Sequence, residues 1–201
     1  MSYHIYTTDG IILKRTAFGE ANVLLHILTN ELGLIMASAR SARLSVSKLG
    51  PALQEYAHIS VSCIKGKNGW KVTNVVEKGS FYFEYPEYSH QVVAQVATLL
   101  LKMITGEAPH PEIFQTVQSG FEFLKNVLQK DISNFETLMV LRILYELGYV
   151  SSHTHTQGNP VYVEVFLKNV TEWNSELLEE VAENKLVLVS LINKGLKESH
   201  L

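Results

Sequence analysis

The segment AHISVSCIKGKNGWKVTNVV, residues 57–76, decides the fold. Residues 57–63 alternate apolar and polar side chains, which is the period-2 pattern of a half-buried strand. Residues 65–69 then predict a hairpin connection, because Asn68-Gly69 supplies the positive φ angles that a tight turn needs. The return strand is predicted over Trp70–Val76. The segment therefore indicates antiparallel β-structure rather than a helix.

Three more strands are predicted on the amino-terminal side, over Gly10–Arg15, Ala21–Thr29 and Leu34–Arg40. The middle one is apolar on both faces, which is typical of a central strand or a barrel position. Five strands in about 80 residues, joined by short turns, favour a small closed or nearly closed barrel. The longest gap, Ser41–Pro51, follows the third strand. An OB-fold carries its variable connection there, so the sequence favours an OB-fold over an SH3-like barrel.

The hydrophobic period becomes helical from Glu87 onward. Pro111 suits a first helical position, Ser133 and Glu136 fit a capping box that opens a further helix, and Gly148 is a plausible end of that helix. Residues 151–171 lose the period, and residues 175–194 regain it. The expected organisation is an OB-fold domain over residues 1–80 that binds nucleic acid, and an all-α domain over residues 81–201 that binds partners.

Composition narrows the class of protein further. The 201 residues are 46% hydrophobic and 18% charged, which indicates a globular chain. Cys63 is the only cysteine, so a disulfide framework is excluded, and its place in the alternating strand predicts a buried structural thiol. No apolar run approaches the roughly 18 residues of a membrane span, and Met1–Tyr6 lacks the features of a secretion signal. We therefore expect the protein to be located in a reducing cytoplasm.

The net charge of -3 hides an asymmetry between the two halves of the chain. Residues 1–80 hold nine Lys/Arg and five Asp/Glu, a net of +4, whereas residues 81–201 hold eight and fifteen, a net of -7. A basic first half followed by an acidic second half suggests two surfaces with different partners.

No catalytic constellation is visible, so we expect a protein that is not an enzyme. The sequence contains no Gly-x-Ser-x-Gly elbow, phosphate-binding loop or dinucleotide fingerprint. His153 and His155 form a close histidine pair to which Glu164 would add a carboxylate. Two imidazoles without further spaced ligands favour a solvated loop over a metal site, so no metal is expected.

Basic and aromatic side chains of the predicted barrel give the stronger functional signal. Cations neutralise phosphates, and aromatic rings stack on bases without reading their sequence. The candidate DNA-binding residues are Lys14, Arg15, Arg40, Arg43, Lys48, Tyr56, Lys65, Lys67, Trp70 and Lys71. The alternative is that the cations are ordinary solvated residues and that Trp70 packs into the core.

Several motifs together resemble the bacterial RecO family, the recombination mediators of DNA repair. The motifs lie in order over residues 8–149, and the last 50 residues match only in being helical. They are Thr8–Arg15, Phe18–Ala21, Leu28–Gly33, Ala39–Arg43, Ser47–Leu49, Leu53–Tyr56, His110–Phe114 and Leu141–Tyr149.

The resemblance implies an OB-fold followed by a helical domain, without bond-making catalysis. Family members bind single- and double-stranded DNA, anneal complementary strands, work with RecR, contact the carboxyl-terminal tail of the single-stranded DNA-binding protein, and help to load RecA. Arg40, Arg43 and Lys48 match the family's basic loop, and Lys14 and Arg15 match its basic first strand. The resemblance also implies that the protein is located in the cytoplasm in association with the nucleoid.

The chain departs from the family pattern at two places. Many members carry a four-cysteine zinc site after the Leu-Gly-Tyr segment, but residues 150–167 contain no cysteine, so no cofactor is expected. The basic loop has Leu44-Ser45-Val46 where more charge is usual, so it carries fewer cations. Fewer phosphate contacts predict weaker DNA binding and a shallower salt dependence.

Arg142 is the candidate cation for the acidic tail of the single-stranded DNA-binding protein. The alternatives are a protein–protein adaptor on the same fold and an OB-type RNA-binding protein.

Overall fold

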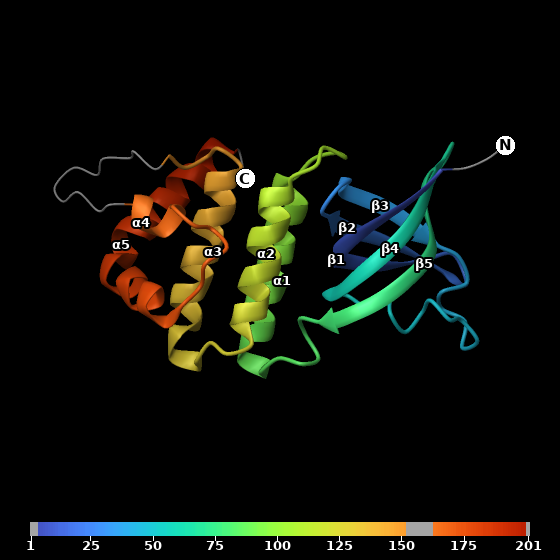
Figure 1. Ribbon diagram of the computed structural model, residues 1–201, viewed down its shortest axis with the longest axis horizontal. Coiled ribbons are helices and arrows are strands. Elements are labelled where there is room, and N and C mark those ends of the chain that lie inside the picture. Colours follow the sequence, from blue (N-terminus) through green and yellow to red (C-terminus); the bar gives the residue numbers. More distant parts are fainter. Residues whose placement is uncertain (1–3, 152–162, 200–201) are drawn as a thin grey trace. The chain divides into compact units, whose positions relative to one another are not determined.

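The computed structural model describes residues 4–151 and 163–199, and within them five strands precede all the helices (Figure 1). The strands are β1 (Ile5–Phe18), β2 (Asn22–Thr29), β3 (Gly33–Ala39), β4 (Ala57–Gly66) and β5 (Gly69–Ser80). The helices are α1 (Glu87–Met103), α2 (Pro111–Leu124), the 3-10 turn η1 (Gln129–Asp131), α3 (Ile132–Glu146), α4 (Glu164–Leu167) and α5 (Ser175–Glu198). The predicted succession of a β region and a helical region is confirmed.

The strands form a closed barrel in the order β1-β2-β3-β5-β4, which fits the predicted OB-fold. Strand β1 is longer than the sequence predicts, because its first half pairs with β4 and its second half with β2. An irregularity between Ile12 and Lys14 bends β1 at the change of partner. Strands β3 and β5 run parallel and close the barrel through the pairs Ala37–Trp70 and Ser38–Lys71.

Alternating side chains fill the inside of the barrel. In β4 every second residue is buried from Ala57 to Cys63, as the period-2 pattern predicts. The thiol of Cys63 is fully buried, and this burial raises its pKa to about 12. Such a thiol stays protonated, so the predicted structural cysteine is confirmed as a buried group without nucleophilic character.

The boundaries of α3 show one wrong prediction and one that is confirmed. The helix begins at Ile132, directly after η1, so Ser133 lies in its first turn and makes no capping box. The Ser133 hydroxyl instead accepts a hydrogen bond from Lys185 Nζ at 2.8 Å. The helix ends before Gly148, whose φ of 79° allows its N–H to reach the Tyr145 carbonyl at 2.9 Å.

The last part of the chain contains the short helix α4 and the long helix α5. The sequence is compatible with either one strand or irregular chain over residues 161–167. Residues 161 and 162 lie outside the described residues, and Glu164–Leu167 forms one helical turn instead of a strand. Asn174 caps α5 by accepting a hydrogen bond from the Leu177 N–H at 2.7 Å. The histidine pair His153 and His155 lies outside the described residues. No helix among the described residues is long and apolar enough to cross a membrane.

Internal contacts divide the chain into two compact units. The first unit runs to Glu84 and includes Ala97–Phe114, and the second contains Tyr85–Val96 and the chain from Gln115 onward. The barrel and the linker between α1 and α2 therefore belong to one unit. The assignment of separate functions to residues 1–80 and 81–201 stays a prediction.

Candidate nucleic-acid interface

One exposed side of the barrel gathers basic and apolar side chains from four strands. The strand register pairs Lys14 with His26 and His26 with Met36, and in a second row it pairs Leu24 with Ser38. Directly paired residues point to the same side of a sheet. The members of this outward face, as we call it, are Lys14, Thr16, Leu24, His26, Met36, Ser38 and Lys71. None of the seven carries a negative charge.

The central residue of the outward face is His26, which the sequence analysis did not single out. It is half-buried between Lys14 on β1 and Met36 on β3. Burial, and to a smaller extent the charge of Lys14, holds its pKa below the ordinary value of 6.5. His26 is therefore neutral at neutral pH and gains its proton only at a pH below 6.5. The predicted strand that contains His26 is apolar on both faces in the sequence, so nothing in the sequence indicates that His26 faces outward.

Arg15 does not share this face with Lys14, although the two are adjacent in sequence. Arg15 pairs with Leu25, whose side chain is fully buried, so the two lie on the inner side of the pleat. Its backbone N–H donates to Glu55 Oε1 at 2.8 Å. Its side chain lies under the connection between β3 and β4, the β3–β4 loop of residues 40–56.

The β3–β4 loop carries Arg40, Arg43 and Lys48, and all three are exposed. Arg43 holds the loop against the turn after β1, because its Nη1 donates to the Gly19 carbonyl at 3.1 Å. Its backbone N–H donates to the Ala21 carbonyl at 2.9 Å. Within the described part of the chain, these three cations form no ion pair with a carboxylate.

The β4–β5 hairpin carries Lys65 and Lys67. Lys67 is exposed at the tip, whereas Lys65 Nζ lies 2.5 Å from Glu107 Oε2 in the linker between α1 and α2. The hydrogen bond from Lys65 holds the pKa of Glu107 below its ordinary value. Lys65 is therefore partly neutralised, which the sequence could not indicate because its partner is 42 residues away.

Trp70 occupies the barrel core, with 5% of its surface exposed. Its ring meets Tyr6 edge to face with the centroids 5.3 Å apart, and Lys65 Nζ lies 5.3 Å from the ring centroid. Of the two interpretations left open by the sequence, the core position is correct. The prediction that Trp70 contacts DNA is corrected, because a buried indole presents no ring face to a base.

Aromatic rings outside the core form a short array at the end of the barrel. Tyr56 stacks on Tyr82 with the centroids 5.8 Å apart, and Tyr82 meets Phe83 edge to face at 5.6 Å. Phe83 is 74% exposed. Tyr56 has the unusual φ of 64°, which hydrogen bonds of its backbone to Ile12 and Phe81 maintain. Tyr82 and Phe83 were missed because no periodic pattern covers the stretch that joins β5 to α1.

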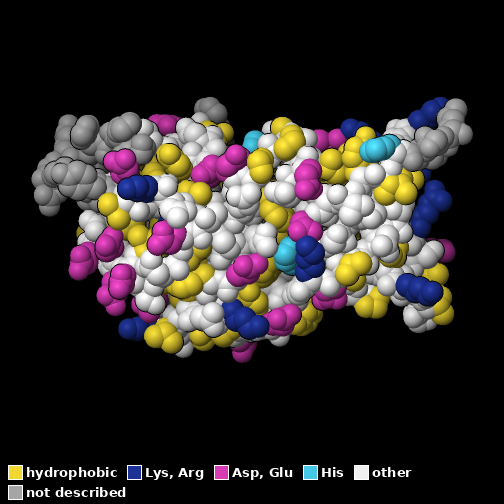
Figure 2. All heavy atoms as spheres, viewed as in Figure 1, with side chains coloured by type: hydrophobic (Ala, Val, Ile, Leu, Met, Phe, Trp, Pro, Cys, Tyr) yellow, Lys and Arg dark blue, Asp and Glu magenta, His cyan; other side chains and the backbone are white. Residues whose placement is uncertain are grey.

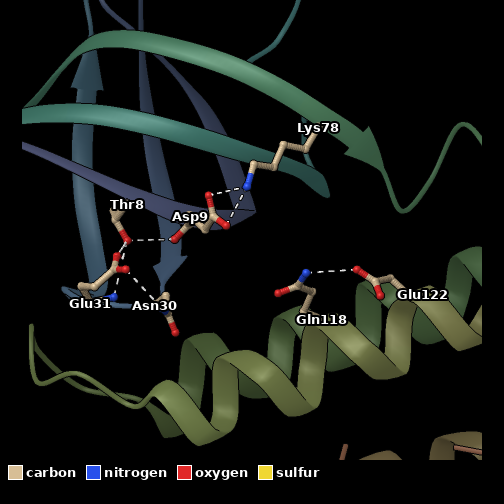
Figure 3. A network of polar contacts seen from close by, with 7 residues as sticks. All are labelled: Thr8, Asp9, Asn30, Glu31, Lys78, Gln118 and Glu122. Carbon is tan, nitrogen blue, oxygen red and sulfur yellow. Dashed lines mark hydrogen bonds and ion pairs between the residues drawn. The ribbon is translucent and has the colours of Figure 1, made fainter.

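A different part of the barrel gathers carboxylates instead (Figure 3). Lys78 Nζ lies 2.7 Å from both carboxylate oxygens of Asp9. The carboxylate of Glu31 accepts a hydrogen bond from the Thr8 hydroxyl. The charge of Lys78 is therefore balanced within the barrel, and Lys78 is a poor candidate for a phosphate contact.

Arg142 has a structural role in the second unit. Its side chain is 1% exposed and donates to the carbonyls of Phe166, Val170 and Glu172 at 2.9, 3.1 and 2.7 Å. Its guanidinium carbon lies 4.4 Å from the centroid of the Trp173 ring. Burial lowers its pKa to about 10, so the group stays charged at neutral pH. Its burial and these three bonds to carbonyls disfavour the prediction that Arg142 receives an acidic partner tail.

The surroundings of Arg142 also disfavour an acidic ligand. A cavity of about 550 Å³ beside it is lined by Glu172, Glu176 and Glu180, with Lys168 as the exposed cation. Asp and Glu side chains gather over α4 and α5 in Figure 2. This part of the second unit is therefore negatively charged, as the sequence predicts. Among the residues that the structure describes, no group of three His, Cys, Asp or Glu could hold a metal ion.

Comparisons with known proteins find similarity over the part of the chain that forms the barrel. The family described as Recombination protein O N terminal matches residues 1–77. The chain is 33% identical over 130 residues to the DNA repair protein RecO of Dehalococcoides mccartyi strain 195, covering 64% of this chain and 51% of the relative. It is 28% identical over 148 residues to that of Heliobacterium modesticaldum, covering 72% and 52%. The chain thus spans about half the length of these curated relatives.

Proposed function

Because this chain belongs to the bacterial RecO family, we propose that it is a DNA repair and recombination mediator that binds single-stranded DNA on its barrel. The outward face carries the proposal. Lys14 and Lys71 lie on a surface without carboxylates, and apolar Leu24 and Met36 lie between them. Cations that contact phosphates and apolar side chains that contact bases are what a single strand requires.

The mechanism is electrostatic capture without bond-making chemistry. Lysine and arginine side chains neutralise phosphates and release the counterions condensed on the strand. The exposed cations of the β3–β4 loop, Arg40, Arg43 and Lys48, extend the contact. The array of Tyr56, Tyr82 and Phe83 offers an exposed ring for stacking. Neutralised strands repel each other less, which would promote annealing of complementary DNA and permit binding of double-stranded DNA.

The resemblance to the family suggests which partner proteins would take part when this chain binds DNA. We propose that the protein works with RecR, meets the carboxyl-terminal tail of the single-stranded DNA-binding protein, and helps to load RecA on the captured strand. Such a protein would act at the nucleoid in the cytoplasm and would need no cofactor. The acidic surroundings of Arg142 direct the search for the tail site to other parts of the chain.

Removing the two lysines of the outward face tests the DNA site. We expect K14Q/K71Q to weaken binding of a fluorescent single-stranded oligonucleotide by roughly 10- to 30-fold, as for two lost phosphate contacts. The slope of log affinity against log salt should fall by about 1.4, since each contact to a single strand contributes about 0.7. Fluorescence anisotropy across a salt series measures both quantities.

The matched control removes two exposed lysines from the helices instead. K102Q/K130Q changes the net charge equally and should leave the affinity within about twofold. Equal losses in both double variants would show nonspecific attraction and refute the outward face as the site. No binding by the wild-type chain at low salt would favour the protein–protein adaptor. Tighter binding of structured RNA than of single-stranded DNA would favour the RNA-binding alternative.

His26 gives the same face a pH dependence. Its pKa is lowered, so the ring gains a proton only as the pH falls below 6.5, and phosphates bind the protonated form better. We expect affinity for single-stranded DNA at constant ionic strength to rise as the pH falls below 6.5, by up to roughly fivefold more than in H26Q once the ring is protonated, as for one added charge contact of about 1 kcal/mol. Identical pH profiles of the two proteins would remove His26 from the interface.

A further inference from the structure

The β3–β4 loop and β1 line an open pocket of about 430 Å³ in the first unit. Two guanidinium groups, two hydroxyls and one amide line it, together with small and apolar residues. The lining residues are Arg15, Ala42, Arg43, Leu44, Ser45, Ser47, Gly50, Pro51 and Gln54. No carboxylate side chain is among them, so the lining carries two positive charges and no negative charge.

Arg15 provides the main observation that points to a ligand in this pocket. Its Nε is buried and has no hydrogen-bond partner among the described residues. A buried donor of a charged group without an acceptor costs free energy, so native proteins rarely keep one. An oxyanion in the pocket would accept this hydrogen bond and balance the charge.

Among the other polar groups of the lining, Arg43 and Ser47 keep donors for a ligand, and Gln54 braces the turn beside them. Arg43 uses Nη1 on the Gly19 carbonyl, which fixes its guanidinium and leaves other N–H groups for a ligand. Ser47 Oγ accepts from the Gly50 N–H at 3.2 Å, so its own hydroxyl hydrogen remains available. Gln54 Nε2 donates to the Gly50 carbonyl at 2.9 Å and braces the same turn. These bonds shape the pocket before any ligand arrives.

We propose that this pocket binds one phosphate group, held between the guanidinium groups of Arg15 and Arg43. The inference deepens the proposed function, on which it rests for the source of the phosphate, because the β3–β4 loop that lines the pocket also carries exposed cations of the proposed DNA site. Guanidinium groups match the geometry of phosphate oxygens better than ammonium groups do. The volume is also large enough to admit the sugar attached to the phosphate.

The test follows the Arg15 Nε–H signal in the ¹H–¹⁵N spectrum of the full chain during titration with inorganic phosphate. We expect a saturable shift of this signal in the wild type, at constant ionic strength set with chloride. R15Q and R43Q should each weaken phosphate binding at least tenfold, judged from the shifts of loop amides. K102Q is the matched control, because it removes one exposed charge from α1, outside the pocket. A linear, non-saturating response, or equal weakening by K102Q, would overturn the proposal.

A second titration identifies the source of the phosphate. Oligothymidines with a 5′-phosphate and with a 5′-hydroxyl are compared on the same signals. Equal binding of the two indicates an internal phosphodiester, and tighter binding of the 5′-phosphate indicates a strand end; both support the pocket. Saturable phosphate binding with no DNA binding would refute the proposed function alone. Normal DNA affinity and an unchanged Arg15 signal in the complex would refute the pocket alone. R43Q keeps the test valid if R15Q does not fold, because Arg43 is exposed on the loop.

Discussion

Arg142→Met is expected to lower the free energy of unfolding by about 3–5 kcal/mol, the range for removing one member of a buried charged network. The substitution leaves the carbonyls of Phe166, Val170 and Glu172 without their donor in the interior. It also removes the cation that lies over the ring of Trp173. Unsatisfied buried carbonyls cost more than the methionine side chain can recover by packing.

Urea unfolding followed by circular dichroism of the helices measures this loss. Lys168→Met is the matched control, since Lys168 lies in the segment that supplies those carbonyls but has an exposed side chain, and it should change stability by less than about 0.5 kcal/mol. Arg142→Lys keeps the charge without the planar set of donors and should recover only part of the loss. A stability of Arg142→Met within about 1 kcal/mol of the wild type would contradict the structural role.

Gly33→Ala is expected to destabilise the first unit by about 2–4 kcal/mol, combining the strain of a left-handed backbone with overpacking. Gly33 begins β3 with a φ of 71°. A Cβ atom there would overlap with the backbone carbonyl of Ala108, in the linker between α1 and α2. Backbone atoms on both sides cannot move aside as a flexible side chain could.

A second glycine in that linker separates the two causes. Gly106 has a φ of 83°, and nothing lies within 4 Å of the position of its Cβ. Gly106→Ala should therefore carry only the backbone cost of about 1–2 kcal/mol. The difference between the variants in urea unfolding measures the close approach at Gly33. Equal losses would show that Ala108 gives way without cost.

Most of the barrel could be predicted because its signals are local. The alternation of residues 57–63 reports directly on burial, and β4 has that pattern. The full length of β1 could not be predicted, because Ile5–Asp9 are ordered by pairing with Val61, Cys63 and their neighbours in β4. The capping box at Ser133 failed for a related reason, since the turn η1 supplies helical backbone before the expected start.

The candidate site was predicted by residue type but not by arrangement. Lys14 and Arg15 occupy opposite sides of β1, and only the register with β2 shows which faces the outward surface. Lys65 and Arg142 meet partners that are 24 to 42 residues distant, so no local pattern could report their neutralisation or burial. His26 was hidden because leucine and isoleucine surround it in the chain.

The closure of the barrel has a consequence for its motions. Strands β3 and β5 are joined through only two residue pairs, whereas their other neighbours in the sheet are paired along most of their length. Amide hydrogens at this seam should exchange with deuterium sooner than those between β1 and β2, because fewer bonds must break together. Ser38 and Lys71 lie at the seam and on the outward face alike. A DNA strand bound across Ser38 and Lys71 would contact β3 and β5 together and stabilise their pairing. DNA should therefore slow amide exchange there and raise the temperature at which the barrel unfolds.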